Sequence, residues 1–428
     1  MPDLKKIFTH PDYEHEPVPV VERQNMWDIV FVWIGFVATM GSLMLGLRIG
    51  LSLTFWNLIW AILLSIVILV GVEVLTSIIG QKTGLTFSLA IRHVFGKYGM
   101  ILPAGIMGLV LLGWIGFDIA WAPGFAQGAL GWNFILLCVI ITIIYTVTGY
   151  IGWSGLMWLS RITMPVFIIL CLVYVWAAIG KVGVSGILAF QPDKPMPFAA
   201  AVGSLVGLWY VGAMTALDVN RFAKSVGQTV HACWIGMGVV RPFITLAGAL
   251  AAMAYGTANP GAILAEFGFW AALLGFILIF LIMWTTTDNA AYSSALAFAG
   301  INRRLSKKVL VVGIMIFGLV TAAAGILGIF LQYLLFIGAI VPPIAGVLIA
   351  DFWVVQRGSK QTESGAKLKV AGWRWSAVVT WLLATGLAIW FTVIKLPWAF
   401  LWVLLIAFVL HIVLSRIIKE PVQRVPGW

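Results

Sequence analysis

Charged residues are scarce in this sequence: Asp, Glu, Lys and Arg make up 10% of its 428 residues. Ordinary water-soluble domains contain about 25%, so soluble enzymes and disordered proteins are excluded. Cysteine is scarce too, and the three cysteines, Cys138, Cys171 and Cys233, lie in apolar runs. The sequence therefore indicates neither a disulfide framework nor a cysteine metal site. The five histidines are scattered near the termini and the ends of apolar runs, without the spacing of a catalytic or metal centre.

Hydrophobic residues, by contrast, make up 62% of the chain, and the mean hydropathy is +1.06. A membrane-spanning helix needs about 20 mostly apolar residues, and the sequence contains twelve such runs. They cover residues 27–49, 54–79, 100–128, 132–150, 155–180, 198–219, 231–256, 269–299, 308–328, 329–351, 373–394 and 397–418. These runs lack the alternation of apolar and polar residues that is typical of β-barrel strands. The sequence predicts an all-α polytopic membrane protein with twelve transmembrane helices.

The formal net charge of +11 is unevenly distributed between the loops. With a cytoplasmic N-terminus, 21 of the 26 Lys and Arg residues face the cytoplasm, four face the other side, and Arg241 lies within the seventh run. Cytoplasmic loops of membrane proteins carry such an excess of basic residues. We therefore expect both termini in the cytoplasm and the chain in the inner (cytoplasmic) membrane. The charge is a signal of topology and predicts no nucleic-acid partner.

The two halves of the chain echo each other. Trp114 and Asp118 are four residues apart in the third run, and Trp284 and Asp288 are four apart in the eighth, 170 residues later. This offset predicts a repeat of five helices, and an odd number makes the second copy inverted, as in secondary transporters. The predicted units are an N-terminal tail at 1–26, repeats at 27–180 and 198–351, a cytoplasmic loop at 352–372, two further helices at 373–418 and a tail at 419–428.

Glycines interrupt the first run of each predicted repeat. Gly35 and Gly41 lie in the first run, Gly207 and Gly212 lie in the sixth, and Gly35 and Gly207 are 172 residues apart. One interpretation is close packing, because small residues let membrane helices approach each other. Glycine also lets a helix unwind, so that freed carbonyls bind a cation and helix ends face a substrate. Because the pattern occurs in both halves, we favour unwinding in both helices.

Five ionisable side chains lie within or at the edge of apolar runs: Glu73, Asp118, Arg241, Asp288 and Asp351. A charge at the bilayer centre is costly and is expected to face the bundle interior. Glu73 and Asp351 lie near predicted cytoplasmic ends, which indicates interfacial or structural roles. Arg241 either neutralises an internal acid or caps a kinked helix. Asp118 lies deep in its run and either lines a substrate site or forms an ion pair with Arg241.

A dense polar cluster, Trp284-Thr-Thr-Thr-Asp-Asn289, occupies the eighth run. Hydroxyl and carbonyl oxygens suit hard cations, so this cluster is a candidate cation site. Trp114 and Trp209 lie beside small residues on candidate cavity helices. Paired indoles can sandwich a planar ring or hold a cation at the π face.

Together these motifs point to a known family. The chain resembles the nucleobase:cation symporters, and within them the bacterial cytosine permeases, over residues 27–355. The resemblance implies the leucine-transporter fold, in which ten helices form two inverted repeats, followed here by two further helices. The motifs that carry it are Gly80-Gln-Lys-Thr-Gly84-Leu-Thr, Gly113-Trp-Ile-Gly116, Asp218-Val-Asn-Arg221-Phe222, Trp284-Thr-Thr-Thr-Asp-Asn289, and Pro342-Pro343-Ile-Ala-Gly346 followed by Ala350-Asp351.

The resemblance also implies site residues. In the family the substrate ring stacks between aromatic residues of helices 3 and 6, which match Trp114 and Trp209. A sodium ion is held by carbonyls of the broken first helix and by oxygens of helix 8. The implied substrate-binding residues are Thr39, Trp114, Asp118, Leu208, Trp209 and Thr287, and the implied sodium ligands are Gly35, Ala38, Ile282, Thr285 and Thr286.

Two positions depart from the family pattern. Thr287 stands where cytosine permeases have an asparagine that reads the base, and Asp118 stands where they have a glycine and the hydantoin permease has an amide. An amide donates and accepts hydrogen bonds, whereas a carboxylate only accepts them. The site is therefore predicted to suit a donor-rich or cationic compound, such as an aminopyrimidine or a guanidino compound, rather than cytosine.

We expect a secondary transporter that imports a small nitrogenous, nucleobase-like solute by sodium symport with alternating access. One alternative is a proton-coupled symporter or a uniporter of an organic cation that uses Asp118. A second alternative is a non-transporting membrane receptor or enzyme. The expected partners are the substrate, sodium or a proton, and the lipid bilayer. A monomer is compatible with the sequence, which leaves the oligomeric state open.

Overall fold

The structure is a computed structural model, and it describes residues 13, 15–151, 153–302, 304–357, 370–420, 425 and 427–428. Half of the predicted N-terminal tail and most of the predicted loop at 352–372 lie outside these residues. Within them the chain forms helices and a single isolated β-bridge, between Gln24 and Ala223. The described chain is thus the all-α protein that its composition predicts.

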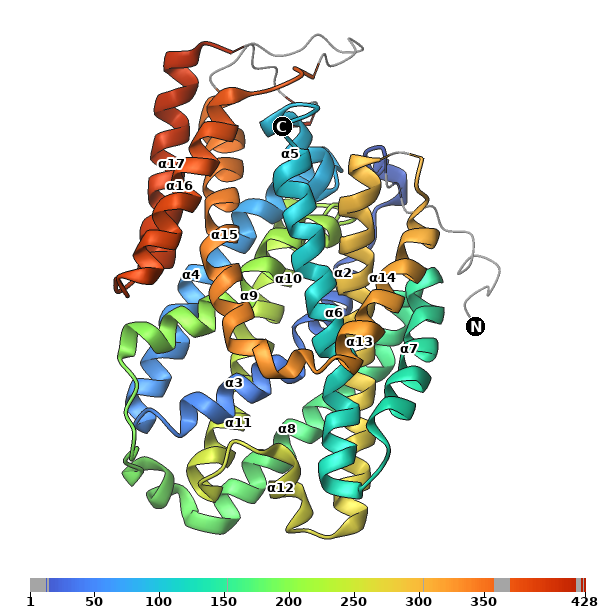
Figure 1. Cartoon of the computed structure of the whole chain (residues 1–428), viewed down its shortest axis with the longest axis vertical. Helices are drawn as coiled ribbons and strands as arrows, with labels where there is room; N and C mark the ends of the chain where they lie inside the picture. The colour runs from blue at the N-terminus through green and yellow to red at the C-terminus, as the bar shows by residue number, and fades with distance from the viewer. Residues whose placement is uncertain are drawn as a thin grey trace.

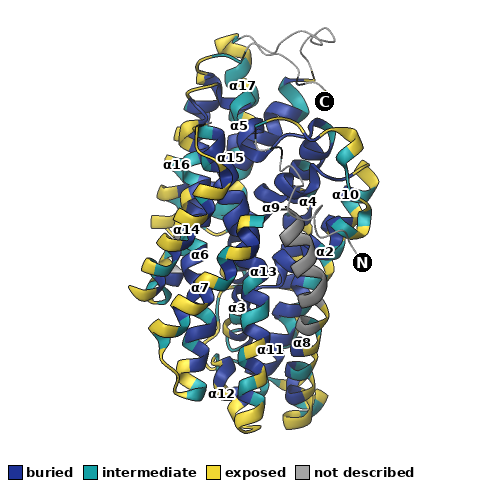
Figure 2. Ribbon diagram, turned by 90° about the vertical axis from the view of Figure 1, so that its right-hand side faces the viewer, coloured by how far each residue is buried: buried dark blue, intermediate teal, exposed yellow. Residues whose placement is uncertain are grey.

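Ten of the described helical segments are long and apolar enough to cross a membrane, and Figure 1 shows most of the helices along the long axis of the molecule. They are α4 (Phe55–Thr83), α6 (Ile101–Leu130), α7 (Phe134–Ile151), α8 (Trp153–Ala189), α9 (Phe198–Asn220), the segment Val226–Tyr255, α13 (Phe269–Ile301), α15 (Phe330–Ala350), α16 (Trp375–Val393) and α17 (Ala399–Ile418). The segment Val226–Tyr255 consists of α10 (Val226–Cys233), a π-helical stretch (Trp234–Val240) and α11 (Arg241–Tyr255). Shorter helices are α5 (Phe87–Phe95) and α12 (Pro260–Ala265). Exposed side chains follow the outer faces of helices such as α14 (Lys307–Ala323) and α16, where lipid would contact them (Figure 2).

The first predicted span is broken in the middle. Its halves, α2 (Met26–Val37) and α3 (Met40–Gly50), meet at an angle of 52°. Ala38 has a non-helical backbone with ψ of 81°, and Thr39 is extended. The Thr39 hydroxyl accepts a hydrogen bond from the Gly41 amide at 3.1 Å and so caps the second half. The break that we expected from the glycines therefore falls at an alanine and a threonine.

The prediction of a second unwound helix is wrong. Helix α9 continues without interruption through Gly207 and Gly212. A continuous helix satisfies its own backbone hydrogen bonds, which a membrane otherwise leaves without partners. Gly212 instead makes room for an aromatic side chain, because a Cβ at this position would lie 2.6 Å from the Trp209 ring.

The predicted boundary between the ninth and tenth spans is also shifted. Helix α14 (Lys307–Ala323) has 17 residues, so it ends before the predicted limit at 328. Gly325 follows with φ of 84°, a left-handed conformation that favours glycine, and a short 3-10 turn (Ile326–Ile329) leads into α15. With the bent pair counted once, the described chain has eleven full-length spans, and α14 is a twelfth that falls short of the usual ~20 residues.

The helix contacts have the symmetry of an inverted repeat. Five spans, from the bent pair to α8, form one unit, and five, from α9 to α15, form the other. Helices α6 and α13, the third of each unit, pack extensively against each other. The two other extensive contacts, α4 with α9 and α3 with α11, are equivalent when the two units are exchanged. The five-plus-five arrangement is therefore visible in the packing, with α16 and α17 added after it.

Glycines bring α3 and α11 into backbone contact. A Cβ on Gly46 would lie 2.2 Å from the carbonyl oxygen of Thr245, and a Cβ on Gly248 would lie 2.4 Å from that of Leu43. Real Cβ atoms do not approach an oxygen so closely, so any side chain there would push the helices apart. For these glycines the close-packing interpretation is correct.

Of the interfacial and structural roles expected for Glu73, the structure contains the structural one. Glu73 is fully buried within α4 and lies within electrostatic range of Arg241, whose side chain is also buried, although its carboxylate oxygens have no hydrogen-bond partner in the described chain. Arg241 in addition donates hydrogen bonds to the Ser65 hydroxyl at 2.9 Å and to the Met237 carbonyl at 3.4 Å. Arg241 therefore neutralises an internal acid, and this acid is Glu73 rather than Asp118.

Asp351 has the structural surroundings that we expected. Its carboxylate is fully buried, forms an ion pair with the Arg374 guanidinium at 2.6 Å and accepts a hydrogen bond from the His411 ring at 2.9 Å. These contacts tie the end of α15 to the start of α16 and to α17.

Both described ends of the chain lie at the same end of the bundle. The Val18 amide donates to the Gly84 carbonyl at 3.0 Å, and the Lys82 ammonium lies 4.9 Å from the centre of the Trp428 ring. Gly84 and Lys82 are at the end of α4, so both tails are on one side of the membrane.

We predict that Gly46→Ala lowers the melting temperature of the detergent-purified protein, because the added methyl group meets the Thr245 carbonyl. Overpacking of this kind costs about 1–3 kcal/mol. The matched control is Gly71→Ala, where a Cβ has no neighbour within 4 Å. Alanine is the better helix former by about 0.5–1 kcal/mol, so this control should leave the melting temperature unchanged or raise it. Equal melting temperatures for the two variants would contradict the backbone contact.

We also predict that Glu73→Gln destabilises the protein by about 3–5 kcal/mol, because it leaves the buried Arg241 charge uncompensated. The double variant Glu73→Gln/Arg241→Gln should recover part of this loss in thermal unfolding. Glu266→Gln is the control, since its partner Lys181 and its own side chain are exposed and the pair is 2.9 Å apart. An exposed pair contributes only about 0–1 kcal/mol. A double variant less stable than either single one would refute the pairing.

Candidate substrate and cation site

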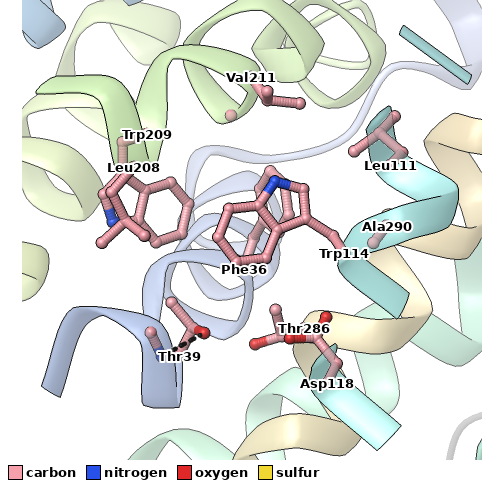
Figure 3. Close-up of a pocket in the computed structure, with 12 residues that line it drawn as sticks. Phe36, Thr39, Leu111, Trp114, Asp118, Leu208, Trp209, Val211, Thr286 and Ala290 are labelled. Carbon is pink, nitrogen blue, oxygen red and sulfur yellow. Dashed lines mark hydrogen bonds between the residues drawn. The ribbon is translucent and has the colours of Figure 1, made fainter. Parts of the chain in front are cut away.

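A small cavity lies at the centre of the bundle, next to the break between α2 and α3 (Figure 3). Its volume is about 40 Å³, which holds only a few water molecules. A ring-shaped substrate therefore needs the cavity walls to move apart. The lining residues are Phe36, Thr39, Gly41, Leu111, Trp114, Asp118, Leu208, Trp209, Val211, Gly212, Thr286 and Ala290.

Trp209 forms one wall of the cavity and comes from α9 (Figure 3). Its indole N–H donates a hydrogen bond to the Ser42 hydroxyl of α3 at 2.9 Å. Its ring meets the edge of Phe36, with 5.7 Å between the ring centres. The orientation of this indole thus depends on residues on both sides of the break in the first span.

Trp114 forms the opposite wall and comes from α6 (Figure 3). Its ring contacts Phe330 and Tyr333 of α15 edge-on, with ring centres 5.9 and 5.5 Å away. The Tyr333 hydroxyl donates to the Val110 carbonyl of α6. Aromatic residues at the start of α15 therefore support the Trp114 ring. Sequence reasoning missed this aromatic cluster, because aromatic residues in an apolar run give no distinct signal.

Asp118 is the only acidic residue that lines the cavity. Its side chain is 1% exposed, and its Oδ2 atom has no hydrogen-bond partner within the described chain. Because Arg241 belongs to Glu73, the alternative of an Asp118–Arg241 ion pair is not what the structure contains.

The second Trp–Asp pair of the internal repeat is used for packing. The Trp284 indole donates to the Thr148 hydroxyl of α7 at 2.7 Å. Asp288 is buried and faces Thr148 and Gly149 of α7. Neither residue lines the cavity. The repeat thus places one pair at the cavity and the equivalent pair between α13 and α7.

Four of the five expected sodium ligands meet between the break and α13. The Thr286 hydroxyl donates to the Ala38 carbonyl at 3.1 Å and to the Ile282 carbonyl at 3.3 Å. The Thr285 hydroxyl also donates to the Ile282 carbonyl, at 2.8 Å. Gly35 lies in the last turn of α2, where helix carbonyls lack partners within the helix. Neutral carbonyl and hydroxyl oxygens are a donor set that fits a hard monovalent cation.

Five of the six expected substrate residues line the cavity: Thr39, Trp114, Asp118, Leu208 and Trp209. The sixth, Thr287, does not line it. Its hydroxyl is turned to its own helix and donates to the Met283 carbonyl at 2.6 Å.

Polar contacts join three helices on the side of the bundle where the tails lie. Arg221, at the end of α9, donates hydrogen bonds to the Tyr292 hydroxyl of α13 at 2.9 Å and to the Tyr13 carbonyl at 2.8 Å. Asp218 accepts from the Phe87 amide at the start of α5, at 2.7 Å. These contacts join α9 to α13 and α5 on the side where both tails lie.

Solved structures show the same fold. The chain superimposes with a TM-score of 0.84 on a nucleobase-cation-symport-1 family transporter in a closed conformation with bromovinylhydantoin bound, at 21% identity and 96% coverage of each chain. For an inward-facing form the TM-score is 0.79. A Na⁺-coupled sialic acid symporter gives 0.73 at 14% identity, covering 96% of this chain and 92% of that one. The fold is therefore the leucine-transporter fold that the sequence motifs imply.

Sequence comparison extends the likeness to family level. The cytosine permease of Escherichia coli (strain K12) is 29% identical over 378 residues, which cover 88% of each chain. The hydantoin permease of Microbacterium maritypicum is 24% identical over 372 residues, covering 80% of this chain and 75% of that one. The model of permeases for cytosine/purines, uracil, thiamine and allantoin matches residues 17–411. The chain is thus a multi-pass membrane transporter, not an enzyme, and it belongs to this family of permeases.

Proposed function

We propose that this permease imports a small, donor-rich or cationic nitrogenous solute by sodium symport, and that Trp114, Asp118 and Trp209 bind it. The observation that carries this proposal is the buried Asp118 carboxylate at a cavity whose other lining residues are uncharged. We further propose cytoplasmic termini in the inner membrane and repeats at 27–180 and 198–351. Thr287, whose hydroxyl bonds to its own helix in this structure, would contact the substrate only once the cavity walls have moved apart.

The chemistry of Asp118 limits the class of substrate. A carboxylate accepts hydrogen bonds and carries negative charge, and a buried one is stable only with a cation or with donors around it. A neutral base presents donors on only part of its edge and has no positive charge to compensate Asp118. An aminopyrimidinium or guanidinium would satisfy it and would also stack on the faces of Trp114 and Trp209.

Coupling to sodium would act through the break in the first span. Gly35, Ala38, Ile282, Thr285 and Thr286 would hold the ion, which supplies positive charge that fastens the break to α13. The Thr286 hydroxyl already donates to the Ala38 carbonyl, so α13 and the break in the first span are in contact where the ion would bind. Thr39 lines the substrate cavity and follows Ala38 directly. The sodium site and the substrate site are therefore adjacent in the chain, so that binding at one can affect the other. A ligand shifts the equilibrium between the transporter's states only by binding one state more tightly than the other.

The test is a ligand screen by thermal shift on purified protein, with and without sodium. One panel contains neutral bases (cytosine, uracil, hydantoin, allantoin), and the other contains aminopyrimidines, creatinine and guanidino compounds. We expect sodium-dependent stabilisation by the second panel alone. Asp118→Asn should weaken binding about 10- to 150-fold, as for a lost charged hydrogen bond of about 1.5–3 kcal/mol. The exposed Asp193→Asn is the control, and stabilisation of the wild type by cytosine would contradict the proposal.

A second candidate is proton coupling through Asp118, which its buried and partly unpartnered carboxylate favours. The two mechanisms differ in transport by proteoliposomes. With sodium as the coupling ion, Asp118→Asn keeps a sodium-dependent residual uptake and Thr286→Val loses it. With a proton as the coupling ion, Asp118→Asn abolishes the response to a pH gradient and Thr286→Val leaves that response intact.

We predict that Ser42→Ala lowers ligand affinity about five-fold without loss of folding. The substitution removes the acceptor that orients the Trp209 indole, and a buried hydrogen bond contributes about 1 kcal/mol. Ser204→Ala on the exposed face of α9 is the control, since its hydroxyl bonds only to its own helix. Affinity is measured by titration of the best ligand of the screen. Equal affinities for the two variants would show that Ser42 does not position the ring.

A further inference from the structure

A second hollow lies on the flank of the bundle, between α7 and α14 and apart from the transport cavity. These two helices are neighbours (Figures 1 and 2) and pack against each other. The hollow has a volume of about 560 Å³. Its walls are almost entirely apolar, and the lining residues are Val139, Thr142, Ile143, Thr146, Val147, Tyr150, Ile151, Lys308, Val312, Ile316 and Leu319.

The groove has the length of one leaflet of a bilayer. Its α14 wall extends from Lys308 to Leu319, which at 1.5 Å per residue is about 16 Å. Half of a hydrocarbon core of ~30 Å is about 15 Å. Threonines in the α7 wall do not interrupt the apolar surface, because the Thr142 and Thr146 hydroxyls bond to their own helix at 2.7 and 2.6 Å.

One end of the groove is basic. Lys308 is exposed, and its ammonium lies 5.0 Å from the centre of the Tyr150 ring. Arg304, four residues before it in the chain, is also exposed. Neither wall contributes an acid, because the sequence contains no Asp or Glu from 289 to 350 or from 134 to 151. Asp288 of α13 comes near, but it is buried and faces Gly149 rather than lining the groove. Among the residues that line the groove, a phosphate at this end would therefore meet Lys308 and the Tyr150 phenol.

We propose that the groove binds an anionic glycerophospholipid, with one acyl chain along the apolar wall and the phosphate at Lys308. The apolar part alone would accept any lipid of the bilayer. Selectivity comes from the charged end, because a basic residue near the surface favours an anionic headgroup. The groove is apolar along its length and ends at a lysine, which suits a lipid better than a protein helix with its own polar face.

The consequence concerns the two helices that the lipid bridges. Gly149 of α7 packs against Val311 of α14 and against Asp288 of α13, directly beside the groove. A lipid seated between α7 and α14 therefore stabilises the helices that support α13 and its cation-site threonines. This inference does not depend on which solute is transported.

The experiment is native mass spectrometry of the full-length protein with phosphatidylglycerol and phosphatidylcholine of the same acyl composition. We expect the wild type to retain phosphatidylglycerol about five-fold better, since one basic residue near the surface contributes about that factor. Lys308→Gln should abolish the preference. Lys224→Gln, an exposed lysine at the same end of the bundle, is the matched control and should keep it. A preference that survives Lys308→Gln, or none in the wild type, overturns the proposal.

A second pair of variants tests the groove itself. Val147 is 58% exposed in the groove, and Val147→Trp should lower the retention of phosphatidylglycerol. Val393→Trp places the same ring at a position 73% exposed on α16 and should have no effect. Excess soluble glycerol phosphate should not displace the lipid, because it lacks the acyl chain. Full displacement by glycerol phosphate, or equal retention by the two tryptophan variants, would overturn the acyl-chain part of the proposal.

Discussion

The hydrogen bond from the Thr286 hydroxyl to the Ala38 carbonyl connects the two features on which the rest of the molecule depends. A membrane interior offers no water to a broken helix, so freed backbone groups must find partners within the protein. Thr39 supplies one partner by capping α3, and Thr286 supplies another from α13. The break is thus tolerated because α13 lies against it. Both candidate sites exist because of the break, since it frees carbonyls on one side and opens the cavity on the other.

Buried charge is treated in two different ways in this bundle. Glu73 of α4 lies within electrostatic range of the buried Arg241 guanidinium of α11, although its carboxylate oxygens have no hydrogen-bond partner in the described chain, and the guanidinium donates to the Ser65 hydroxyl. Asp118 has no cationic partner within the described chain, although it is buried as deeply. An uncompensated carboxylate in a membrane interior costs free energy, and such residues therefore usually mark functional sites. The contrast between the two acids in one molecule supports the proposal that Asp118 meets its partner in the transported solute.

The sequence was informative where residue type alone determines the outcome. Runs of apolar residues predicted the spans, and the hydroxyl cluster of the eighth span predicted oxygens that the structure does bring beside the first helix. The sequence was misleading where the role of a residue depends on which side chains surround it in the fold. Glycine is compatible both with unwinding and with close packing, and α9 remained helical because Gly212 accommodates Trp209. The burial of Glu73 could not be predicted, because its partner Arg241 is far away in sequence.

The contact of α3 with α11 fixes the position of one helix against the other. Gly46, Gly50 and Gly248 each receive backbone atoms of the facing helix, so the surfaces mesh at fixed positions. Sliding or rotation of α3 against α11 would press backbone atoms of the two helices together, because no side chain keeps them apart at these glycines. The half-helix that borders both candidate sites is thus held against its counterpart in the other repeat, so that a movement of α3 would be transmitted to α11.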